Sequence, residues 1–394
     1  MKKLLLLNGS FNELHVIHTA HKLGYYVITT GNDISGEGHK YANQYCPCDY
    51  SDKHAVYEIA KKEQVDAICA CSNDFGALSA AYVSERLGLP GHDKYEISRF
   101  FHEKDHFKIM AEDLDLPTPK AKWFRNLESA INYVERLNSF PKIIKPADLS
   151  GGKGIQKVQN KYDARNAITA AFQKSKVKRV LIEDYLEGQQ QGITVFIRNG
   201  KVVLDYTTND YAYVNPYMVW TACSPADNYE TYREQIIADI EKIALKKSIV
   251  DGFLTIQYIL KNGKPYYLET MRRCLGNQHY LCMSKDIGVN FYELYVRSQC
   301  GEDCGYLLRD LHSTNMYSGF MAIFAPSNGI IKSITINPLF QDKLFDVKML
   351  NGPMYRVTDY LNDKIGTLYF TCEKQDLNWF HVNMRNLFHV EMEN

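Results

Sequence analysis

Several features that assign a chain quickly to a functional class are missing from this sequence. Lys plus Arg and Asp plus Glu both number 46, so the formal net charge is zero and the basic excess typical of nucleic-acid-binding proteins is absent. No run of about 18 apolar residues occurs, so we expect no membrane-spanning helix. The apolar run Leu4 to Leu7 stops at Asn8, too early for an export signal. We therefore expect a cytoplasmic protein without nucleic-acid or membrane partners.

Cysteine and glycine are present, but not in the spacings that bind zinc or a dinucleotide. The ten cysteines contain no C-x-x-C pair and are spread along a chain of 394 residues, unlike a small disulfide framework. Cys69 and Cys71 lie in an apolar strand-like run, which favours buried reduced thiols. The first strand-like run is followed by Asn8-Gly9-Ser10, so the G-x-G-x-x-G fingerprint of dinucleotide-binding folds is absent.

What the sequence does contain is a regular alternation of strand and helix patterns in its first 115 residues. Short apolar runs predict strands at residues 3–7, 25–29 and 66–71. Amphipathic stretches between and after them predict helices at residues 12–23, 55–62 and 75–87. Such alternation indicates a parallel sheet covered by helices.

The remainder of the chain has a different pattern, and a length of 394 residues suggests about two to four domains. Helices are predicted at residues 126–137 and 231–247, and strands at residues 141–146, 155–158, 177–182, 192–197, 254–260 and 265–270. From about residue 311 the chain becomes β-rich. We expect a fold that combines α/β and α+β parts, with an N-terminal parallel sheet, a middle segment of mixed strands and helices, and a β-rich C-terminal part.

Two short segments have the chemistry needed to bind a nucleotide. Lys145 ends a predicted strand and is followed by Gly151-Gly152-Lys153-Gly154, whose backbone N–H groups could cradle phosphate. Taken alone, a glycine-rich hairpin with a surface lysine is the commoner explanation of such a pattern. The strand end Glu183-Asp184-Tyr185-Leu186 could bind an adenine edge through its backbone, with its apolar side chains on the ring; an ordinary strand end with solvated acids is the alternative.

The hairpin that carries Gln257 and Glu269 is the third candidate. A two-residue Asn262-Gly263 turn would place these two side chains on opposite faces, whereas an odd-numbered loop pairs them directly. The odd loop collects the apolar side chains on one face, so we predict it; that face carries Leu254, Ile256, Tyr258, Leu260, Tyr266 and Leu268. The opposite face then carries Thr255, Gln257, Tyr267, Glu269 and Met271.

Paired oxygen-bearing side chains suit Mg²⁺, a hard cation that is often held by few protein groups plus nucleotide phosphates. Arg272 and Arg273 follow directly and could stabilise charge on a transferred phosphoryl group. A solvated hairpin edge is the alternative.

In this order the three candidates resemble the ATP-grasp superfamily, and the resemblance covers nearly the whole chain. The family's pattern is matched in chain order by Lys104, by Lys145-Pro146, by Gly151-Gly152-Lys153-Gly154, by Glu183-Asp184-Tyr185-Leu186, by Gln190, by Gln257 and Glu269, and by Arg273 with Asn277. Two positions depart from it. Gln190 replaces the usual acid that holds ribose. Met271 replaces an Asn that helps to bind a second metal, and the thioether of Met is a poor ligand for Mg²⁺.

The resemblance implies a division of the chain and a set of roles. The division is an N-terminal α/β domain (1–115), an ATP-grasp domain (116–310, with lobes of about 119–182 and 186–310) and a C-terminal subdomain (311–394). Lys104 and Lys145 would hold the ATP phosphates under a flap formed by Gly151 to Gly154, with adenine on residues 183–186 and ribose on Gln190. Gln257 and Glu269 would hold Mg²⁺, or Mn²⁺ in its place. Arg273 would clamp an acyl phosphate, with Asn277 nearby.

The implied reaction is ATP-dependent ligation of a carboxylate to an amine through an acyl phosphate, as in amino-acid or peptide ligases. Two other functions stay open. One is a purine-biosynthesis or carbamoyl-phosphate-type enzyme, and the other is a nucleotide-binding subunit without turnover, for which Met271 and Gln190 are the best support. The small-molecule carboxylate and amine are not readable from the sequence, and a homodimer stays open.

Overall fold

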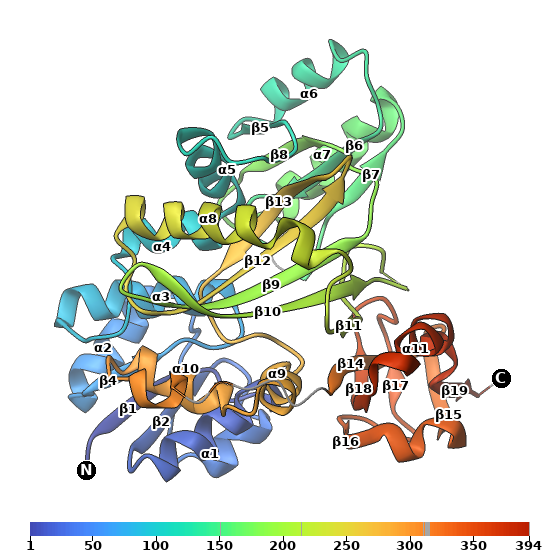
Figure 1. Ribbon diagram of the computed structural model, residues 1–394. Helices are drawn as coiled ribbons and strands as arrows, with labels where there is room; N and C mark the ends of the chain where they lie inside the picture. The colour runs from blue at the N-terminus through green and yellow to red at the C-terminus, as the bar shows by residue number, and fades with distance from the viewer. Residues whose placement is uncertain (150, 214, 310, 312–315, 394) are drawn as a thin grey trace.

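The computed structural model describes residues 1–149, 151–213, 215–309, 311 and 316–393 (Figure 1). The N-terminal part is built on a parallel sheet of order β3-β2-β1-β4. Its elements are β1 Lys3–Leu7, α1 Leu14–Lys22, β2 Tyr26–Gly31, β3 Gln44–Pro47, α2 Lys53–Glu63, β4 Ala67–Cys69 and α3 Asp74–Leu87. The predicted parallel sheet is confirmed, and β3 is an additional strand that the sequence pattern did not reveal. Polar caps define the helix starts, since Asp52 accepts bonds at the start of α2 and Asn73 at the start of α3.

A small antiparallel sheet of order β5-β8-β6-β7 forms a separate lobe at the top of Figure 1. Helices α4 and α5 connect the parallel sheet to it, and α6 and α7 cover it with a core of small and branched apolar side chains. The elements are α4 Tyr95–His102, α5 Lys104–Asp113, β5 Ala121–Phe124, α6 Leu127–Glu135, β6 Lys142–Pro146, β7 Gln156–Val158, α7 Lys161–Lys174 and β8 Val180–Asp184.

The centre of the molecule is an eight-stranded sheet of order β13-β12-β9-β10-β11-β14-β18-β16. Its elements and their covering helices are β9 Gln190–Arg198, β10 Lys201–Tyr211, β11 Thr221–Cys223, α8 Tyr229–Lys247, β12 Gly252–Lys261, β13 Lys264–Met271, α9 Tyr280–Ile287, α10 Phe291–Gln299, β14 Tyr317–Phe324, β16 Leu344–Met349 and β18 Lys364–Cys372. The expected β-rich C-terminal segment therefore extends this central sheet with three of its strands. The others form a small sheet, β17-β15-β19.

The remaining C-terminal elements are β15 Gly329–Ile336, β17 Arg356–Val357, α11 Leu377–Asn383 and β19 Phe388–Met392. Short 3-10 helices connect several elements: η1 Phe11–Glu13, η2 Glu37–Tyr41, η3 Gly305–Leu308, η4 Pro338–Lys343, η5 Lys374–Asp376 and η6 Met384–Asn386. The apolar side chains of β15, β17, β19, α11, η4 and η6 pack with β14 and β18 into one core.

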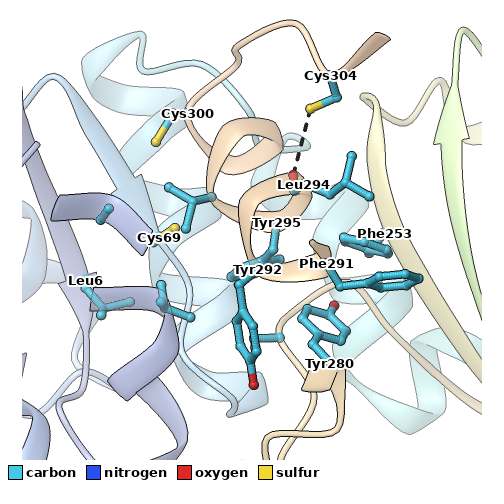
Figure 2. Close-up of a cluster of buried hydrophobic side chains, with 14 of the residues drawn as sticks. Leu6, Cys69, Phe253, Tyr280, Phe291, Tyr292, Leu294, Tyr295, Cys300 and Cys304 are labelled. Atoms are coloured by element: carbon cyan, nitrogen blue, oxygen red, sulfur yellow. Dashed lines mark hydrogen bonds between the residues drawn. The ribbon is translucent and has the colours of Figure 1, made fainter. Parts of the chain in front are cut away.

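Two layers of apolar side chains fix the central sheet. One face is covered by α8, whose isoleucines pack on β9 and β12. The other face contacts α10, which lies between the central sheet and the parallel sheet (Figure 2). Phe291 and Tyr295 of α10 are at most 1% exposed and belong to a cluster with Leu6, Cys69 and Phe253. This apolar layer joins the N-terminal part to the central sheet.

The β12–β13 hairpin corrects the predicted turn while keeping the predicted pair. Asn262 and Gly263 form a two-residue turn at φ 51° and 71°, so the expected odd loop is wrong. A β-bulge instead makes Leu268 the extra residue, and the register passes from Gln257↔Glu269 to Tyr258↔Tyr267. Gln257 therefore pairs with Glu269 as predicted.

The bulge also changes which side chains of β13 are buried. Tyr267 is 1% exposed and packs in the core, whereas Tyr266 and Leu268 are only partly buried. The predicted faces are therefore wrong for these three residues of β13 and right for Leu254, Ile256 and Tyr258 of β12, which are buried together.

All ten cysteines are free thiols, with Cys69 and Cys71 fully buried. Across the part of the chain that the structure describes, no helix is long and apolar enough to cross a membrane.

Candidate functional site

Two adjoining cavities lie on the central sheet. The interlobe cavity, of about 410 Å³, separates the small antiparallel sheet from β12 and β13. The central cavity, of about 340 Å³, lies farther along the sheet, against β14, β18 and the segment that follows β13. Among the residues that the structure describes, eight line both cavities: Gly151, Gly152, Asp210, Tyr217, Met218, Val219, Gln257 and Glu269. The predicted metal pair thus stands where the two cavities meet.

Lysines and one carboxylate form a charged group at the side of the interlobe cavity. Lys145 at the end of β6 and Lys108 on α5 both contact Glu183 of β8, with Nζ to carboxylate oxygen distances of 3.0 and 2.9 Å. Burial alone would raise the pKa of Glu183, but these two positive charges outweigh it and hold the pKa below its usual value. Burial also lowers the pKa of Lys108 to about 8. Two lysines share one carboxylate, so the group carries excess positive charge.

The segment 183–186, the predicted adenine-binding strand end, lines the interlobe cavity together with Gln190. The carboxylate of Glu183 itself is turned to the two lysines, and Asp184 forms an ion pair with Lys142. A ligand in the cavity would therefore contact the backbone of this segment and the side chains of Tyr185 and Leu186.

The glycine loop between β6 and β7 divides into two halves. Gly151 and Gly152 line both cavities, whereas Lys153 is exposed and neither it nor Gly154 lines them. Gly152 has φ +72°, and a Cβ atom there would lie 2.3 Å from the carbonyl oxygen of Tyr217. This position requires glycine because the loop passes directly against the segment before β11. The Tyr217 hydroxyl also accepts a hydrogen bond of 2.7 Å from the backbone N–H of Lys157.

The hairpin places the Gln257 amide and the Glu269 carboxylate side by side in the register of β12 and β13. Lys104, at the first position of α5, lies 3.1 Å from Glu269 through its Nζ and donates to the carbonyl oxygen of Leu149 at 2.7 Å. Burial alone lowers the pKa of Lys104, but the Glu269 and Asp74 carboxylates raise it above its usual value. Met271 lines the central cavity next to this pair.

Asp210 of β10 is a further carboxylate that lines both cavities. It is buried and accepts a hydrogen bond of 2.8 Å from Thr208. Burial raises its pKa to about 7, although hydrogen bonds from Thr208 and Gln190 act in the opposite direction. A buried carboxylate of this kind gains stability from a nearby cation.

The central cavity takes its polar groups from distant parts of the chain. Arg273 lines it and bonds Asp74 at the start of α3, with an Nε to Oδ1 distance of 2.7 Å. Asp74 also accepts from His102, and its pKa is held below its usual value by Arg273 and His102 against the effect of burial. Arg273 is thus held in place by the N-terminal part.

Asn277 and Lys364 form the second polar pair of the central cavity. The Lys364 ammonium on β18 donates to Asn277 Oδ1 at 2.7 Å and lies 5.0 Å from the ring centre of Phe11. Burial lowers the pKa of Lys364 to about 8. Apolar and aromatic side chains make up much of the remaining wall, with Tyr206, Leu275, Met283, Phe320, Ala322 and Phe324 among them.

The structure brings most of the predicted nucleotide- and metal-binding residues to the lining of the interlobe cavity: Lys104, Lys145, Gly151, Gly152, Glu183 to Leu186, Gln190, Gln257 and Glu269. Sequence reasoning missed Lys108, Asp74, Asp210 and Lys364. Lys108 lies four residues after Lys104, so it shares its helix face. Asp74 follows a buried parallel strand, the usual edge for ligands. Asp210 and Lys364 have no such local signal.

Comparisons with known proteins find similarity in sequence and in fold. Residues 102–216 match the family model of the phosphoribosylglycinamide synthetase ATP-grasp (A) domain. The carbamoyl phosphate synthase large chain of Clostridium perfringens (strain 13 / Type A) is 25% identical over 313 residues, which cover 77% of this chain and 27% of that protein. The chain therefore spans about a quarter of the length of the curated relatives that it matches.

Two solved structures resemble the chain over its whole length. The L-amino acid ligase of Bacillus licheniformis superposes with a TM-score of 0.84 at 17% identity, covering 100% of this chain and 99% of that one. The phosphoribosylglycinamide synthetase of Anaerococcus prevotii superposes with a TM-score of 0.77 at 19% identity and covers 100% of both chains. The chain therefore has the fold of these two proteins, and its residues 102–216 are similar to an ATP-grasp domain.

Proposed function

We propose that the chain is an ATP-dependent ligase that activates a carboxylate as an acyl phosphate and joins it to an amine. The observation that carries this proposal is the meeting of two cavities at Gln257 and Glu269. One cavity is bordered by lysines and a glycine loop, as a triphosphate requires, and the other combines an apolar and aromatic section of wall with the side chains of Arg273 and Lys364. A phosphoryl group bound at the junction would face both.

In the interlobe cavity, the backbone of residues 183–186 would bind adenine, and Lys104 and Lys145 would hold the phosphates. The lysines would be held ready by their carboxylate partners, so little reorganisation would accompany phosphoryl transfer. The turn at Gly151 and Gly152 would lie over the phosphates and exclude water, which otherwise hydrolyses an acyl phosphate.

The donor set at the junction fits Mg²⁺, with Mn²⁺ as a substitute. Glu269 supplies a carboxylate and Gln257 an amide oxygen, and Asp210 lines the same two cavities. Bound there, the metal would neutralise charge on the ATP phosphates. Met271 adds no oxygen on this face, which supports one well-held metal rather than two.

In the reaction, a carboxylate oxygen of the first substrate attacks the γ-phosphorus of ATP, and the bond to the β–γ bridging oxygen breaks to release ADP. The amine nitrogen then attacks the carbonyl carbon of the acyl phosphate, phosphate leaves with the electrons of the C–O bond, and the nitrogen loses a proton. Arg273, held by Asp74, would bind the phosphate oxygens through both steps, with Asn277 beside it.

The test is ADP release from Mg·ATP with pooled carboxylates and pooled amines. We expect release that needs one member of each pool, and a loss of about 100-fold or more for Glu269→Ala. Glu128→Ala, an exposed carboxylate on α6, is the matched control and should change nothing.

Other outcomes would assign a different function. ADP release that needs bicarbonate or a phosphorylated amine would favour a carbamoyl-phosphate or purine-type enzyme. Tight binding of ATP without turnover on any pool would make the chain a nucleotide-binding subunit.

A further inference from the structure

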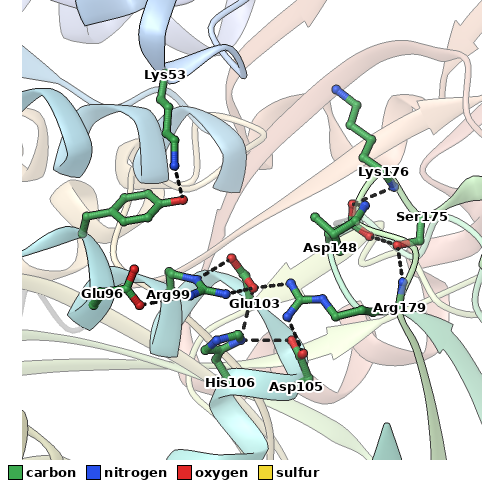
Figure 3. Close-up of polar contacts among 12 residues, drawn as sticks. Lys53, Glu96, Arg99, Glu103, Asp105, His106, Asp148, Ser175, Lys176 and Arg179 are labelled. Carbon is green, nitrogen blue, oxygen red and sulfur yellow. Dashed lines mark hydrogen bonds and ion pairs between the residues drawn. The ribbon is translucent and has the colours of Figure 1, made fainter. Parts of the chain in front are cut away.

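Arg179 directly precedes β8, and its guanidinium is buried between two carboxylates (Figure 3). One nitrogen contacts Asp105 Oδ2 at 2.6 Å, and the other contacts Glu103 Oε2. The side chain is only 6% exposed. Glu103 is held further by Arg99 on α4 at 3.0 Å. This ion network therefore ties the small antiparallel sheet to the start of α5.

The two carboxylates belong to the residues on either side of Lys104. The Lys104 backbone N–H donates to the carbonyl oxygen of Ala147 at 3.0 Å, and the Ala147 N–H donates to the carbonyl oxygen of Arg179 at 3.1 Å. Arg179 therefore contacts the Lys104 segment twice, through its side chain and through Ala147. Leu149, which accepts from Lys104 Nζ, lies just before the glycine loop.

Glu103 and Asp105 with His106 also have the composition of a metal site, since one ligand atom from each lies within 4.8 Å of the others. Their oxygens are already engaged, because Arg179 contacts both carboxylates and His106 lies 3.1 Å from Glu103. His106, Arg99 and Arg179 hold the pKa of Glu103 below its usual range against the effect of burial. A cation would have to displace the arginines, so the network is an ion-pair network.

We propose that Arg179 is a positioning residue for nucleotide binding, which acts through Lys104. It fixes the residues on both sides of Lys104, so that the ammonium is held at the junction of the two cavities beside Glu269. The inference rests on the proposed function, which assigns Lys104 to the ATP phosphates. Arg179 itself does not line either cavity, so its effect on ATP is indirect.

The experiment measures binding of Mg·ATP to the full chain by calorimetric titration. Arg179→Met should weaken binding about tenfold, because a misplaced ammonium loses a charge-assisted contact. Arg179→Lys keeps the positive charge, so its affinity for Mg·ATP should lie between those of Arg179→Met and the unmodified chain. Arg165→Met is the matched control, since Arg165 on α7 is 57% exposed and pairs with Glu135 at the surface; its affinity should be unchanged.

A double-mutant cycle separates positioning from a merely structural role. Lys104→Met should weaken binding by itself, and adding Arg179→Met should then cost nothing more, because the group that Arg179 positions is gone. Losses that multiply in the double variant would overturn the proposal. If Arg179→Met does not fold, Glu103→Gln and Asp105→Asn replace it, and unchanged affinity in both would overturn the proposal equally.

This readout is separate from the ligase reaction. Coupled losses of ATP affinity without any ADP release would contradict the ligase and leave the positioning role of Arg179 supported. If the unmodified chain binds Mg·ATP and the losses from Lys104→Met and Arg179→Met are independent, only the positioning role is contradicted. If the unmodified chain does not bind Mg·ATP, both proposals fail.

Discussion

The two cavities differ in how their charged groups are held. In the interlobe cavity, Lys145 and Lys108 share the Glu183 carboxylate and Lys104 is paired with Glu269, so lysines are anchored by acids. In the central cavity, Lys364 bonds a neutral amide at 2.7 Å and lies over an aromatic ring. Carboxylate partners raise the pKa of Lys104 in the first arrangement, whereas burial lowers the pKa of Lys364 in the second to about 8 with no carboxylate bonded to it. The pKa of Lys108 is also about 8, although Glu183 counteracts its burial.

This difference indicates two kinds of binding. Anchored lysines around a glycine turn form a rigid, charged site that suits a ligand of constant structure such as a nucleotide triphosphate. A wall that is partly apolar and holds a lysine bonded only to a neutral amide suits a smaller ligand that carries its own negative charge. Variants in the two cavities should therefore have separable effects.

The largest expected effect on ATP affinity comes from Lys145→Met in the interlobe cavity. Loss of this ammonium removes a charged contact to phosphate worth about 1.5–3 kcal/mol, so affinity for Mg·ATP should fall roughly 10- to 100-fold. Calorimetric titration with Mg·ATP measures it. The exposed Lys153 serves as comparison, and Lys153→Met should change affinity less than about twofold. Equal losses of affinity at both lysines would show that the whole glycine loop binds phosphate, so that the ATP site would include residues that line neither cavity.

A smaller effect is expected from Lys364→Met in the central cavity, and it is a gain in folding stability rather than a loss of ATP affinity. Burial lowers the pKa of Lys364 to about 8, so the folded protein holds a charged ammonium at neutral pH at a cost. The variant should be more stable than the unmodified chain at pH 7 by about 1–3 kcal/mol, measured by urea unfolding. Its affinity for Mg·ATP should be unchanged, which separates the two cavities.

The pH dependence checks the cause of this gain. Between the folded pKa of about 8 and the higher pKa of an unfolded lysine, the unfolded chain binds more protons than the folded one, so the unmodified protein gains stability as pH rises. The advantage of Lys364→Met should therefore shrink from pH 8 upward. Lys348→Met on the neighbouring strand β16, where the lysine is 34% exposed, should show no such trend. A variant less stable than the unmodified chain at pH 7 would contradict the argument.

The interlobe cavity was the more predictable of the two because its residues lie in short segments with local patterns. The pairing of Gln257 with Glu269 was predicted correctly from the buried face, but for the wrong reason. The structure keeps the two-residue Asn262-Gly263 turn and inserts Leu268 as a bulge. Hydrophobic patterning constrained the register, whereas a bulge and an odd loop shift that register equally and cannot be distinguished by it.

The central cavity was largely invisible because its contacts are long-range. Arg273 was named, but its partner Asp74 is 199 residues away, and Lys364 bonds Asn277 across 87 residues. The fold class itself was confirmed, since strand and helix periodicity reflects local burial. The continuation of the central sheet through β14, β18 and β16 was not expected, because strand neighbours in a mixed sheet depend on tertiary packing.

The smallest expected effect concerns Tyr217, which lines both cavities and therefore tests how far they are independent. Its hydroxyl accepts a hydrogen bond of 2.7 Å from the Lys157 N–H, next to the contact of Gly152 with its backbone. Tyr217→Phe removes about 0.5–1.5 kcal/mol of loop stabilisation, so Mg·ATP affinity should fall by no more than about tenfold. Hydrogen exchange of residues 156–158 and calorimetric titration measure the two consequences.

Tyr185→Phe is the matched control for Tyr217→Phe, because Tyr185 lines only the interlobe cavity and contacts Lys157 through its ring at 3.6 Å. That contact survives removal of the hydroxyl, so exchange of residues 156–158 should not change. If Tyr217→Phe speeds exchange without weakening ATP binding, the loop and the nucleotide are uncoupled. If Tyr217→Phe both speeds exchange and weakens ATP binding, the glycine loop couples nucleotide binding to the central cavity, because Tyr217 forms part of both cavity walls.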